Sequence, residues 1–534
     1  TGERLMTPAS TGIPTSGAGV VSVTDVNGDG LSDLAYSIDG LWRLRLHAGV
    51  QPDLLRVVTD GFGNEVSFAY AALPSAAYTR YSDASYPSQD FSGPMTVVSR
   101  TISSDGIGGQ YSLTFAYFGG RRNMQGRGFQ GFDARSVTDS RNGLAAIDYF
   151  QRDFPMTRRP YRHELRQDSG KLIRKVENEW ATHTDGKGVS SRSFAYLRTS
   201  SERNYSVGAG SWNGRLLSST VSSAKVDRNT GAVTELLRRV TEASGANGRR
   251  GGHEWTERFT QTGLLNETTG GRWCLGRPTT QARQLSHSGA STVTRQAAIT
   301  WDKSNCRSTG MTLDPGHAEL QVRTELSHDR FGNVIARSVT GAGMSPRRTV
   351  VGFSEDGRFP VSLTNALGET SSMSWDTALG LPLMQADANG LVTRWEYDSF
   401  GRRSQVKHPD ETATNWAITD CHPANCSDAG SRIRVSVEQR GSTGKVVHDR
   451  WQELDTFGRL VRSGTRLPSG SYGQTQRSYD SLGRVARQGA PCVGPDCLSE
   501  RFLSYQYDLL GRPLSVTRPL PFGKPGSASR RYEY

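Results

Sequence analysis

Short runs of alternating apolar and polar residues, separated by glycine-rich turns, recur along this chain. Residues 41–46 alternate apolar with basic side chains, and residues 66–70 alternate in a similar way after a turn at 60–64. A period of two is typical of a half-buried strand. Residues 95–102 and 111–117 are rich in β-branched and aromatic side chains, which also favour strands. The pattern predicts an all-β fold.

The composition fits a long, turn-rich protein. At 534 residues the chain exceeds what one hydrophobic core usually supports, so we expect roughly three or four domains or one repetitive array. Apolar residues make up 35% of the chain and glycine contributes 60 residues, which favours short strands over long helices. No apolar run approaches the roughly 18 to 20 residues of a membrane-spanning helix. Thr1 does not open a secretory leader, so we expect the chain to be a fragment.

The net charge of +12 raises nucleic acid, anionic membrane and acidic proteins as partners. The basic residues are scattered, however, and clusters such as 121–122 and 158–159 lack interleaved aromatic residues or a helical frame. We therefore expect a solvated basic surface and no nucleic-acid partner.

Six cysteines fall into three neighbouring pairs: Cys274 and Cys306, Cys421 and Cys426, Cys492 and Cys497. The last two pairs have CxxxxC spacing, whereas zinc sites usually use tighter CxxC pairs with four converging ligands. We favour small-loop disulfides over zinc, and the connectivity stays open. An even number of cysteines fits an oxidising compartment.

A six-residue phrase recurs from about residue 325 onward. Copies of the form Tyr-Asp-x-x-Gly-Arg occupy 397–402, 479–484 and 507–512, and looser copies occupy 328–333, 375–380 and 454–459. Asp can accept hydrogen bonds from the amides of its own turn, and Gly supplies a positive φ angle. The aromatic residue before the Asp and the apolar residue inside the turn can stack on neighbouring copies. Because one hairpin cannot bury its apolar face alone, the repeat predicts strand-turn-strand units that share one sheet.

This phrase resembles the repeat of the Rhs/YD-repeat family, over about residues 325–534. The resemblance implies a hollow β shell, wound as a spiral of strands, that holds a toxic polypeptide until delivery. Rhs shells can carry an autoproteolytic aspartate region near the end of the repeats, but no matching segment stands before Tyr534.

An acidic loop near the start of the chain is the candidate metal site. The side chains of Asp25, Asn27, Asp29 and Asp33 and the carbonyl of Leu31 stand at alternate positions of one tight loop. Ca²⁺ takes six to eight oxygen ligands, so we predict calcium binding here. An EF-hand would need Glu at the twelfth position of the loop and flanking helices, and the sequence offers neither. The alternative is an Asx-rich turn without metal.

Two further resemblances cover the first part of the chain. Residues 25–33 resemble the calcium loop of FG-GAP/VCBS propeller blades, and residues 51–155 resemble the middle region of toxin-complex B components. We therefore expect four segments: a last propeller blade with the calcium loop (1–50), the N-terminal part of a toxin-complex B middle domain (51–155), a β-rich middle or shell region with long loops (156–324) and Rhs/YD repeats (325–534). The expected fold is a propeller-blade remnant followed by a spiral β-sheet shell.

This order is similar to the B component of bacterial insecticidal toxin complexes and to SpvB-like proteins. It implies a secreted, encapsulating shell segment. The implied partners are an encapsulated toxin polypeptide or C component and, for the whole assembly, a pore-forming A component. The alternative is a cell-surface YD-repeat protein that binds carbohydrate or a neighbouring cell.

No catalytic motif of the GxSxG, HExxH or phosphate-binding kind is present in the sequence. His408, His422 and His448 lie near Asp or Cys residues, but ten histidines in a chain of this length produce such neighbours by chance. An enzyme such as an ADP-ribosyltransferase would need a motif of its own. We predict that the chain is not an enzyme.

Overall fold

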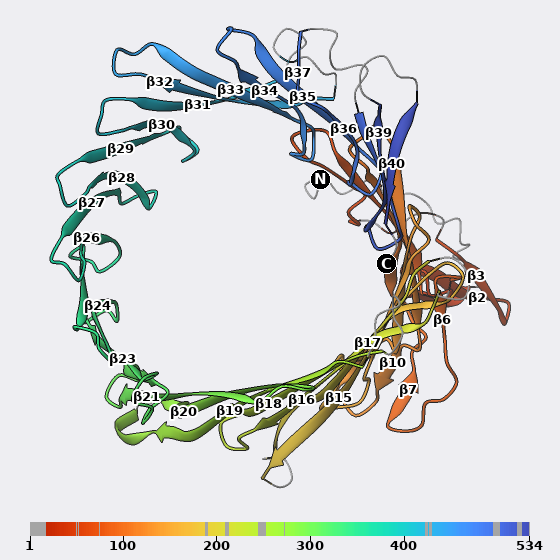
Figure 1. The fold of residues 1–534 in the computed structure, drawn as a ribbon. Coiled ribbons are helices and arrows are strands. Elements are labelled where there is room, and N and C mark those ends of the chain that lie inside the picture. The colour runs from red at the N-terminus through yellow and green to blue at the C-terminus, as the bar shows by residue number, and fades with distance from the viewer. Residues whose placement is uncertain are drawn as a thin grey trace. The chain divides into compact units, whose positions relative to one another are not determined.

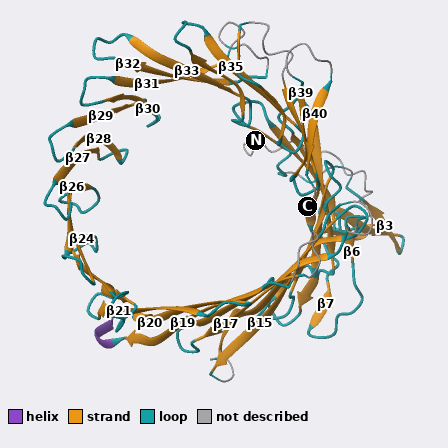
Figure 2. Cartoon of the chain, viewed as in Figure 1, coloured by secondary structure: helices purple, strands orange, loops and turns teal. Residues whose placement is uncertain are grey.

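The computed structural model consists of two compact units, Thr1–Lys171 (unit 1) and Leu172–Tyr534 (unit 2). The structure describes residues 18–47, 49, 51, 53–73, 75–186, 191–208, 213–243, 252–271, 273–421, 426, 430–494, 502–520 and 526–532. Strands and loops make up both units, and the helix among these residues is one short 3-10 turn, η4 (Thr269–Gly271) (Figure 2). The predicted all-β class is confirmed.

Unit 1 contains short strands that form three sheets. Its strands are β1 (Ala18–Thr24), β2 (Asp33–Ile38), β3 (Leu41–Arg45), β4 (Val57–Thr59), β5 (Glu65–Ala72), β6 (Tyr78–Thr79), β7 (Ser88–Asp90), β8 (Thr96–Ser104), β9 (Gln110–Phe118), β10 (Arg121–Asn123), β11 (Gly128–Gly131), β12 (Ala134–Asp139), β13 (Ala145–Phe150) and β14 (Pro160–Arg166). β1, β2 and β3 form an antiparallel meander, and β10 pairs with both β7 and β11. The third sheet runs β4, β5, β8, β9, β12, β13, β14, with β6 parallel to β9.

The core of unit 1 is aromatic. The ring centroids of Phe91 and Phe129 lie 4.9 Å apart, and Phe132 lies 5.3 Å from Phe129 and 4.9 Å from Tyr117. Leu73 is fully buried. Offset and edge-on ring pairs of this kind bury large apolar areas, which gives these short strands a shared core.

Unit 2 is a long series of antiparallel strands. They are β15 (Leu172–Asp185), β16 (Arg192–Tyr205), β17 (Leu216–Val226), β18 (Val233–Glu242), β19 (Glu254–Glu267), β20 (Cys274–His287), β21 (Val293–Asp302), β22 (Arg307–Leu313), β23 (Val322–His328), β24 (Val334–Gly341), β25 (Arg347–Phe353), β26 (Pro360–Thr364), β27 (Thr370–Asp376), β28 (Leu381–Ala386), β29 (Val392–Tyr397), β30 (Arg403–Lys407), β31 (Ala413–Asp420), β32 (Ile433–Arg440), β33 (Val446–Leu454), β34 (Leu460–Arg466), β35 (Tyr472–Tyr479), β36 (Val485–Gly489), β37 (Cys492–Val493), β38 (Phe502–Tyr507), β39 (Pro513–Pro519) and β40 (Ser527–Arg531).

From β15 to β36 each strand of unit 2 pairs with the next in the chain. β35 also pairs with β37, and the series continues through β36, β38, β39 and β40. Taken by itself, this one-layer sheet bends steadily in one direction (Figure 1). It therefore has an inner face and an outer face.

Candidate functional site: an acidic loop and a two-faced repeat sheet

The acidic loop lies between β1 and β2, and its carboxylates accept hydrogen bonds from the loop's own backbone. One oxygen of Asp25 accepts from the amide of Gly28 at 2.6 Å, and the other accepts from the amide of Gly30 at 2.8 Å. Asn27 Oδ1 accepts from the amide of Asp29 at 3.0 Å. Asp29 Oδ1 in turn accepts from the amide of Leu31 at 2.8 Å. The loop is thus wound around its own acidic side chains.

Asp33 closes the loop from a buried position. Its side chain is inaccessible to solvent and accepts from the amide of His47 at 2.7 Å and from that of Val26 at 2.9 Å. These amide donors, His47 first, hold the pKa of Asp33 below its usual value because they stabilise the ionised carboxylate. Asp33 therefore ties the start of the loop to the segment after β3.

The five predicted ligand residues suit a hard cation by their donor chemistry, since carboxylate, amide and carbonyl oxygens are what Ca²⁺ prefers. In arrangement, the side-chain oxygens serve the loop amides, as in an Asx-rich turn, and Asp25 Oδ1 accepts from two of them, the amides of Gly28 and Asp29. Within the described ranges, no three His, Cys, Asp or Glu side chains gather as a metal site. Calcium binding at Asp25, Asn27, Asp29, Leu31 and Asp33 stays a prediction.

The repeated phrase forms a five-residue turn built around its Asp. In the copy at Asp480, the Asp amide donates to the carbonyl of Arg484 at 2.9 Å, and the amide of Gly483 donates to the Asp carbonyl at 2.9 Å. Asp480 Oδ1 accepts from the amides of Leu482 and Arg484 at 3.0 and 2.9 Å. Arg484 Nε donates to the other carboxylate oxygen at 2.7 Å. The Asp, Gly and Arg of the phrase are thus all explained by one turn, which confirms the predicted amide-binding role of the Asp.

The same contacts recur at Asp398, Asp455 and Asp508, where the Arg four residues later donates to the carboxylate at 2.6 to 2.7 Å. The glycine of the phrase needs a positive φ, which is 74° at Gly401. A residue with a Cβ would be strained there.

The aromatic residue before the Asp links one repeat to an earlier strand. The hydroxyl groups of Tyr397, Tyr479 and Tyr507 donate to the carbonyls of Pro382, Leu460 and Val485 at 2.7 to 2.8 Å. Trp375 does the same with its ring N–H, which lies 2.7 Å from the carbonyl of Pro360. A ring with a polar tip makes this link in these copies, whereas the copy with Leu454 at this position has no side-chain donor for it.

The arginine of one copy also contacts the next copy. The guanidinium of Arg484 lies 4.6 Å from the ring centroid of Tyr507 and donates to the carbonyl of Asp508 at 3.1 Å. Arg459 lies 4.6 Å from the ring centroid of Tyr479 in the same manner. These cation–π contacts join consecutive copies along the sheet.

The apolar residue inside the turn behaves less uniformly than predicted. The ring of Phe331 lies where a Cβ on Gly357 would clash, so it does pack on the neighbouring turn. Phe400, however, is 81% exposed. The prediction that this position stacks on neighbouring copies is wrong for Phe400.

One copy of the turn was missed because it lies far outside the repeat region. In unit 1, Asp60 Oδ1 accepts from the amides of Phe62 and Asn64 at 2.9 Å, and Asn64 Nδ2 donates to Asp60 Oδ2 at 2.8 Å. The side-chain bond with Asn64 is the main reason that the pKa of Asp60 lies below its usual value. The turn at Asp329 and Asn333 has the same contacts. The shared letters Asp-x-Phe-Gly-Asn were the signal.

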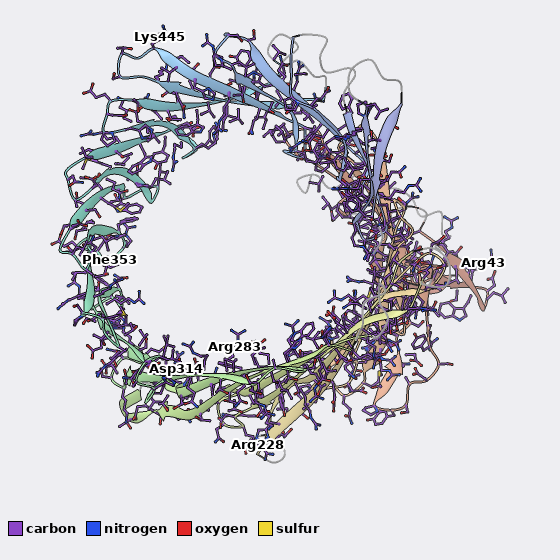
Figure 3. The ribbon with its side chains drawn as sticks, in the orientation of Figure 1. Arg43, Arg228, Arg283, Asp314, Phe353 and Lys445 are labelled. Atoms are coloured by element: carbon purple, nitrogen blue, oxygen red, sulfur yellow. A yellow bond between two sulfur atoms is a disulfide. The ribbon has the colours of Figure 1, made fainter. Side chains whose placement is uncertain are left out.

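The two faces of the unit 2 sheet differ in chemistry. Arg283 projects to the inner side of the bend (Figure 3), and strand registers assign other residues to its face. This inner face carries many large apolar side chains, among them Leu236, Phe259, Leu285, Val293, Met311, Val351, Leu363, Trp395, Trp416 and Val437. Several stay accessible, with Leu285 48% and Val293 57% exposed.

The outer face is dominated by hydroxyl and amide side chains. Its members include Thr256, Thr260, Gln284, Ser286, Thr294, Thr312, Ser338, Ser362, Ser372 and Asn415. Such side chains hydrogen-bond to water at no cost in apolar exposure. The sheet therefore turns a polar surface outward and an apolar one inward.

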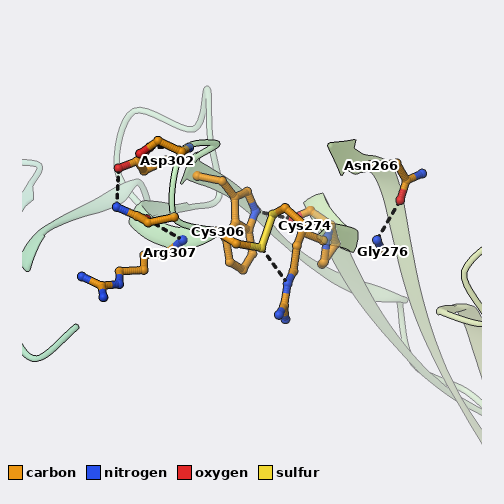
Figure 4. Close-up of a disulfide and its surroundings, with 11 residues drawn as sticks. Asn266, Cys274, Gly276, Asp302, Cys306 and Arg307 are labelled. Carbon is orange, nitrogen blue, oxygen red and sulfur yellow. Dashed lines mark hydrogen bonds between the residues drawn. A yellow bond between two sulfur atoms is a disulfide. The ribbon is translucent and has the colours of Figure 1, made fainter. Parts of the chain in front are cut away.

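Disulfides account for the described cysteines. Cys274 at the start of β20 is bonded to Cys306 in the turn before β22, where Arg277 Nε approaches the sulfur of Cys306 at 3.4 Å (Figure 4). Cys421 is bonded to Cys426, and Cys492 is also disulfide-bonded. The preference for disulfides over zinc is confirmed for these pairs. Cys497 lies outside the described residues.

His408 and His448, the two of the noted histidines that the structure describes, make separate contacts. His408 Nε2 lies 3.3 Å from the hydroxyl of Thr414 on an adjacent strand, and His448 pairs in register with Gln439 on β32. His422 lies outside the described residues. Within the described parts of the chain, no helix is long and apolar enough to cross a membrane.

Two family models match parts of the chain. Residues 4–154 match the family described as the insecticide toxin TcdB middle/N-terminal region, and residues 377–413 match the RHS repeat. Each match covers less than half of the chain, so these two regions are similar to the two families. No curated protein matches the chain in sequence.

Solved structures of toxin complexes share the fold of this chain. The crystal structure of TcdB2-TccC3 without its hypervariable C-terminal region matches with a TM-score of 0.68 and 11% identity, over 93% of this chain and 36% of that one. The Tc holotoxin pore of Photorhabdus luminescens, with a substituted TccC3, matches with a TM-score of 0.66 and 10% identity, over 94% of this chain and 36% of that one. The chain therefore spans about a third of the length of these structures, and at this identity the likeness concerns the fold.

Proposed function

We propose that this chain is a structural segment of a secreted bacterial toxin shell, whose inner face holds a polypeptide cargo before delivery. The observation that carries the proposal is the two-faced sheet of unit 2, with accessible apolar side chains on the inner face of a one-layer bend. Soluble proteins rarely leave large contiguous apolar patches open, and such patches usually mark binding surfaces. The role is structural, and we assign no catalytic residue.

The cargo is a polypeptide because the inner face combines apolar side chains with scattered charged groups over many strands. An unfolded chain presents both kinds of groups along its length, whereas a small ligand would need a compact pocket. By analogy with the TcdB2-TccC3 structures, the cargo is a C-component toxin, and a pore-forming A component is the partner of the whole assembly. The disulfides fit a secreted protein, since such bonds persist in oxidising compartments.

The first test measures binding of a permanently unfolded, fluorescent polypeptide, such as reduced and carboxymethylated lactalbumin, to the purified chain. The inner variant Leu236→Ser with Leu285→Ser should weaken binding, because each substitution removes accessible apolar surface. The matched outer variant Val221→Ser, at a residue 40% exposed, should leave binding unchanged.

Equal affinity of the inner variant and the unsubstituted chain would contradict the proposal. Binding to carbohydrate arrays that is indifferent to the inner substitutions would favour the alternative, a cell-surface YD-repeat protein that recognises carbohydrate or a neighbouring cell.

We also propose that the acidic loop binds Ca²⁺ through Asp25, Asn27, Asp29, the Leu31 carbonyl and Asp33, as a blade-type loop rather than a bare Asx turn. The support is the oxygen-only donor set at alternate positions of one tight loop. Isothermal titration of the chain with CaCl₂ should give one binding event that Asp29→Ala abolishes. A heat signal that survives Asp29→Ala, or no signal at millimolar Ca²⁺, would leave the loop as a metal-free turn.

A further inference from the structure

The inner face of β20–β30 carries basic side chains, and no acidic side chain of these strands lies on the same face. Arg283, Arg295, Arg337 and Arg347 fall on this face by their strand pairings. The carboxylates of the same strands lie on the outer face. They belong to Asp302, Glu325, Asp376 and Glu396. Charge is therefore sorted between the faces along with polarity.

Two of these inner arginines are neutralised by the protein itself. Arg283 lies 2.6 Å from Glu257 on the neighbouring strand β19, and Arg295 lies 2.6 Å from Asp314, the residue directly after β22. Such pairs satisfy both charges within the sheet. Both arginines keep further N–H donors and stay exposed, but the ion pairs offset their charge.

Arg337 and Arg347 have no ion-pair partner among the described residues, and both are exposed. Arg337 lies opposite Thr349, and Arg347 lies opposite Val339, so the two guanidinium groups are diagonal neighbours across β24 and β25. Like charges at such a spacing repel each other, and a carboxylate between them would relieve the repulsion. Leu326 also lies opposite Arg337, so the two arginines have the apolar neighbours Leu326 and Val339 beside the polar Thr349.

Resting on the proposed function, we infer that this part of the inner face binds extended polypeptide segments in which carboxylates alternate with apolar residues. Guanidinium groups bind carboxylates in a bidentate manner, and the flanking Leu326, Val339 and Val351 accept apolar side chains. The spacing of side chains along an extended segment matches that of the strands it lies against. The lining thus selects acidic, apolar stretches of cargo over basic ones.

The test compares two fluorescent peptides that share one Leu, Val, Ser and Gly framework and differ only in that every Glu of one is Lys in the other. Fluorescence anisotropy with the purified chain should show tighter binding of the Glu peptide at low salt. The preference should shrink as salt is raised, since exposed charges are screened.

Neighbouring residues provide a matched control. Arg337→Ser with Arg347→Ser should weaken binding of the Glu peptide by about threefold per arginine, the scale of an exposed ion pair. Arg348→Ser with Arg394→Ser removes the same charge from the outer face and should leave the affinity for the Glu peptide unchanged. Circular dichroism of both variants establishes that each is folded.

The outcomes separate the two proposals. If the Lys peptide binds as well as the Glu peptide, or if the inner and outer variants weaken binding equally, the charge preference is overturned while encapsulation stands. If neither peptide binds, the encapsulating function itself fails. If a short DNA duplex displaces the Glu peptide from the unsubstituted chain but not from the inner variant, the site recognises phosphate and the inference is overturned.

Discussion

The repeat turn makes a sharp prediction at Asp480, whose carboxylate serves three donors at once. Asp480→Ala removes the acceptor for two backbone amides and for Arg484 Nε. Asp480→Asn keeps an oxygen for the amides but loses the charge that Arg484 pairs with. The two substitutions therefore separate the neutral hydrogen bonds from the ionic one.

The magnitude follows from the number and kind of contacts. A net hydrogen bond contributes about 1 kcal/mol and one to a charged group about 1.5 to 3 kcal/mol, with partial overlap among bonds to one carboxylate. The ion pair is partly shielded, since the side chains of Arg484 and Asp480 are 27% and 24% exposed. We expect Asp480→Ala to destabilise the local turn by about 2 to 4 kcal/mol, and Asp480→Asn by about 1 kcal/mol.

Native-state hydrogen exchange is the suitable assay, because neighbouring repeats stabilise one another mainly by local contacts and a global unfolding energy is poorly defined for a long array. The amides of β35 and β36 should lose more protection from exchange in Asp480→Ala than in Asp480→Asn. The amides of β20 should exchange equally in both variants and in the unsubstituted chain. Asp420→Ala, at the end of β31, removes a carboxylate for comparison. Unchanged protection of β35 and β36 in Asp480→Ala would refute the proposed role of the turn.

Three further outcomes are expected. Gly464→Ala should destabilise β33 and β34 by about 1 to 3 kcal/mol in thermal melts, because an added Cβ would meet the Trp451 ring. Gly61→Ala is the control, since a Cβ there meets nothing within 4 Å. Equal shifts of the melting temperature in the two variants would contradict this prediction. The pKa of Asp356 is lowered to about 2 by the Ser354 hydroxyl and Arg358, so its stabilising effect is present above the unfolded value near 3.8 and is lost as pH falls toward 2. Carboxyl carbon NMR should place the midpoint of its titration near 2, and a midpoint near 4 would refute the assignment. Reduction of the Cys274–Cys306 bond, or Cys306→Ser, should raise proteolysis of the turn between β21 and β22 but not of that between β25 and β26, since the bond anchors the former turn to β20.

Much of the fold could be predicted from the sequence because strands and turns leave local signals. The alternation at 41–46 and the β-branched run at 95–102 correspond to β3 and β8, although β3 is exposed along its whole length and not half-buried as its alternation predicted. The stretch 156–324 was harder to interpret. It was predicted to have long loops, but strands such as β15 and β20 have 14 residues each. Their sequences mix polar and apolar residues because both faces of a one-layer sheet are partly open, so the period is blurred.

The site was predictable to a different extent. The roles of Asp and Gly in the repeat follow from turn chemistry alone. The contact of Arg484 with Tyr507 does not, because it joins positions more than twenty residues apart that only the strand register brings together. The inner apolar face also depends on register, since a shift by one residue exchanges the two faces.

The sorting of side chains by register has a consequence for how such a sheet can change over time. Along each strand, consecutive side chains lie alternately on the inner face and on the outer face of the sheet. Substitutions at every second position can therefore adapt the inner face to a different cargo, while the outer face, the turns and the strand pairing stay unchanged. A one-layer sheet thereby lets one surface diversify under selection while the other is conserved, which a sheet buried on one side by a shared core cannot do as freely.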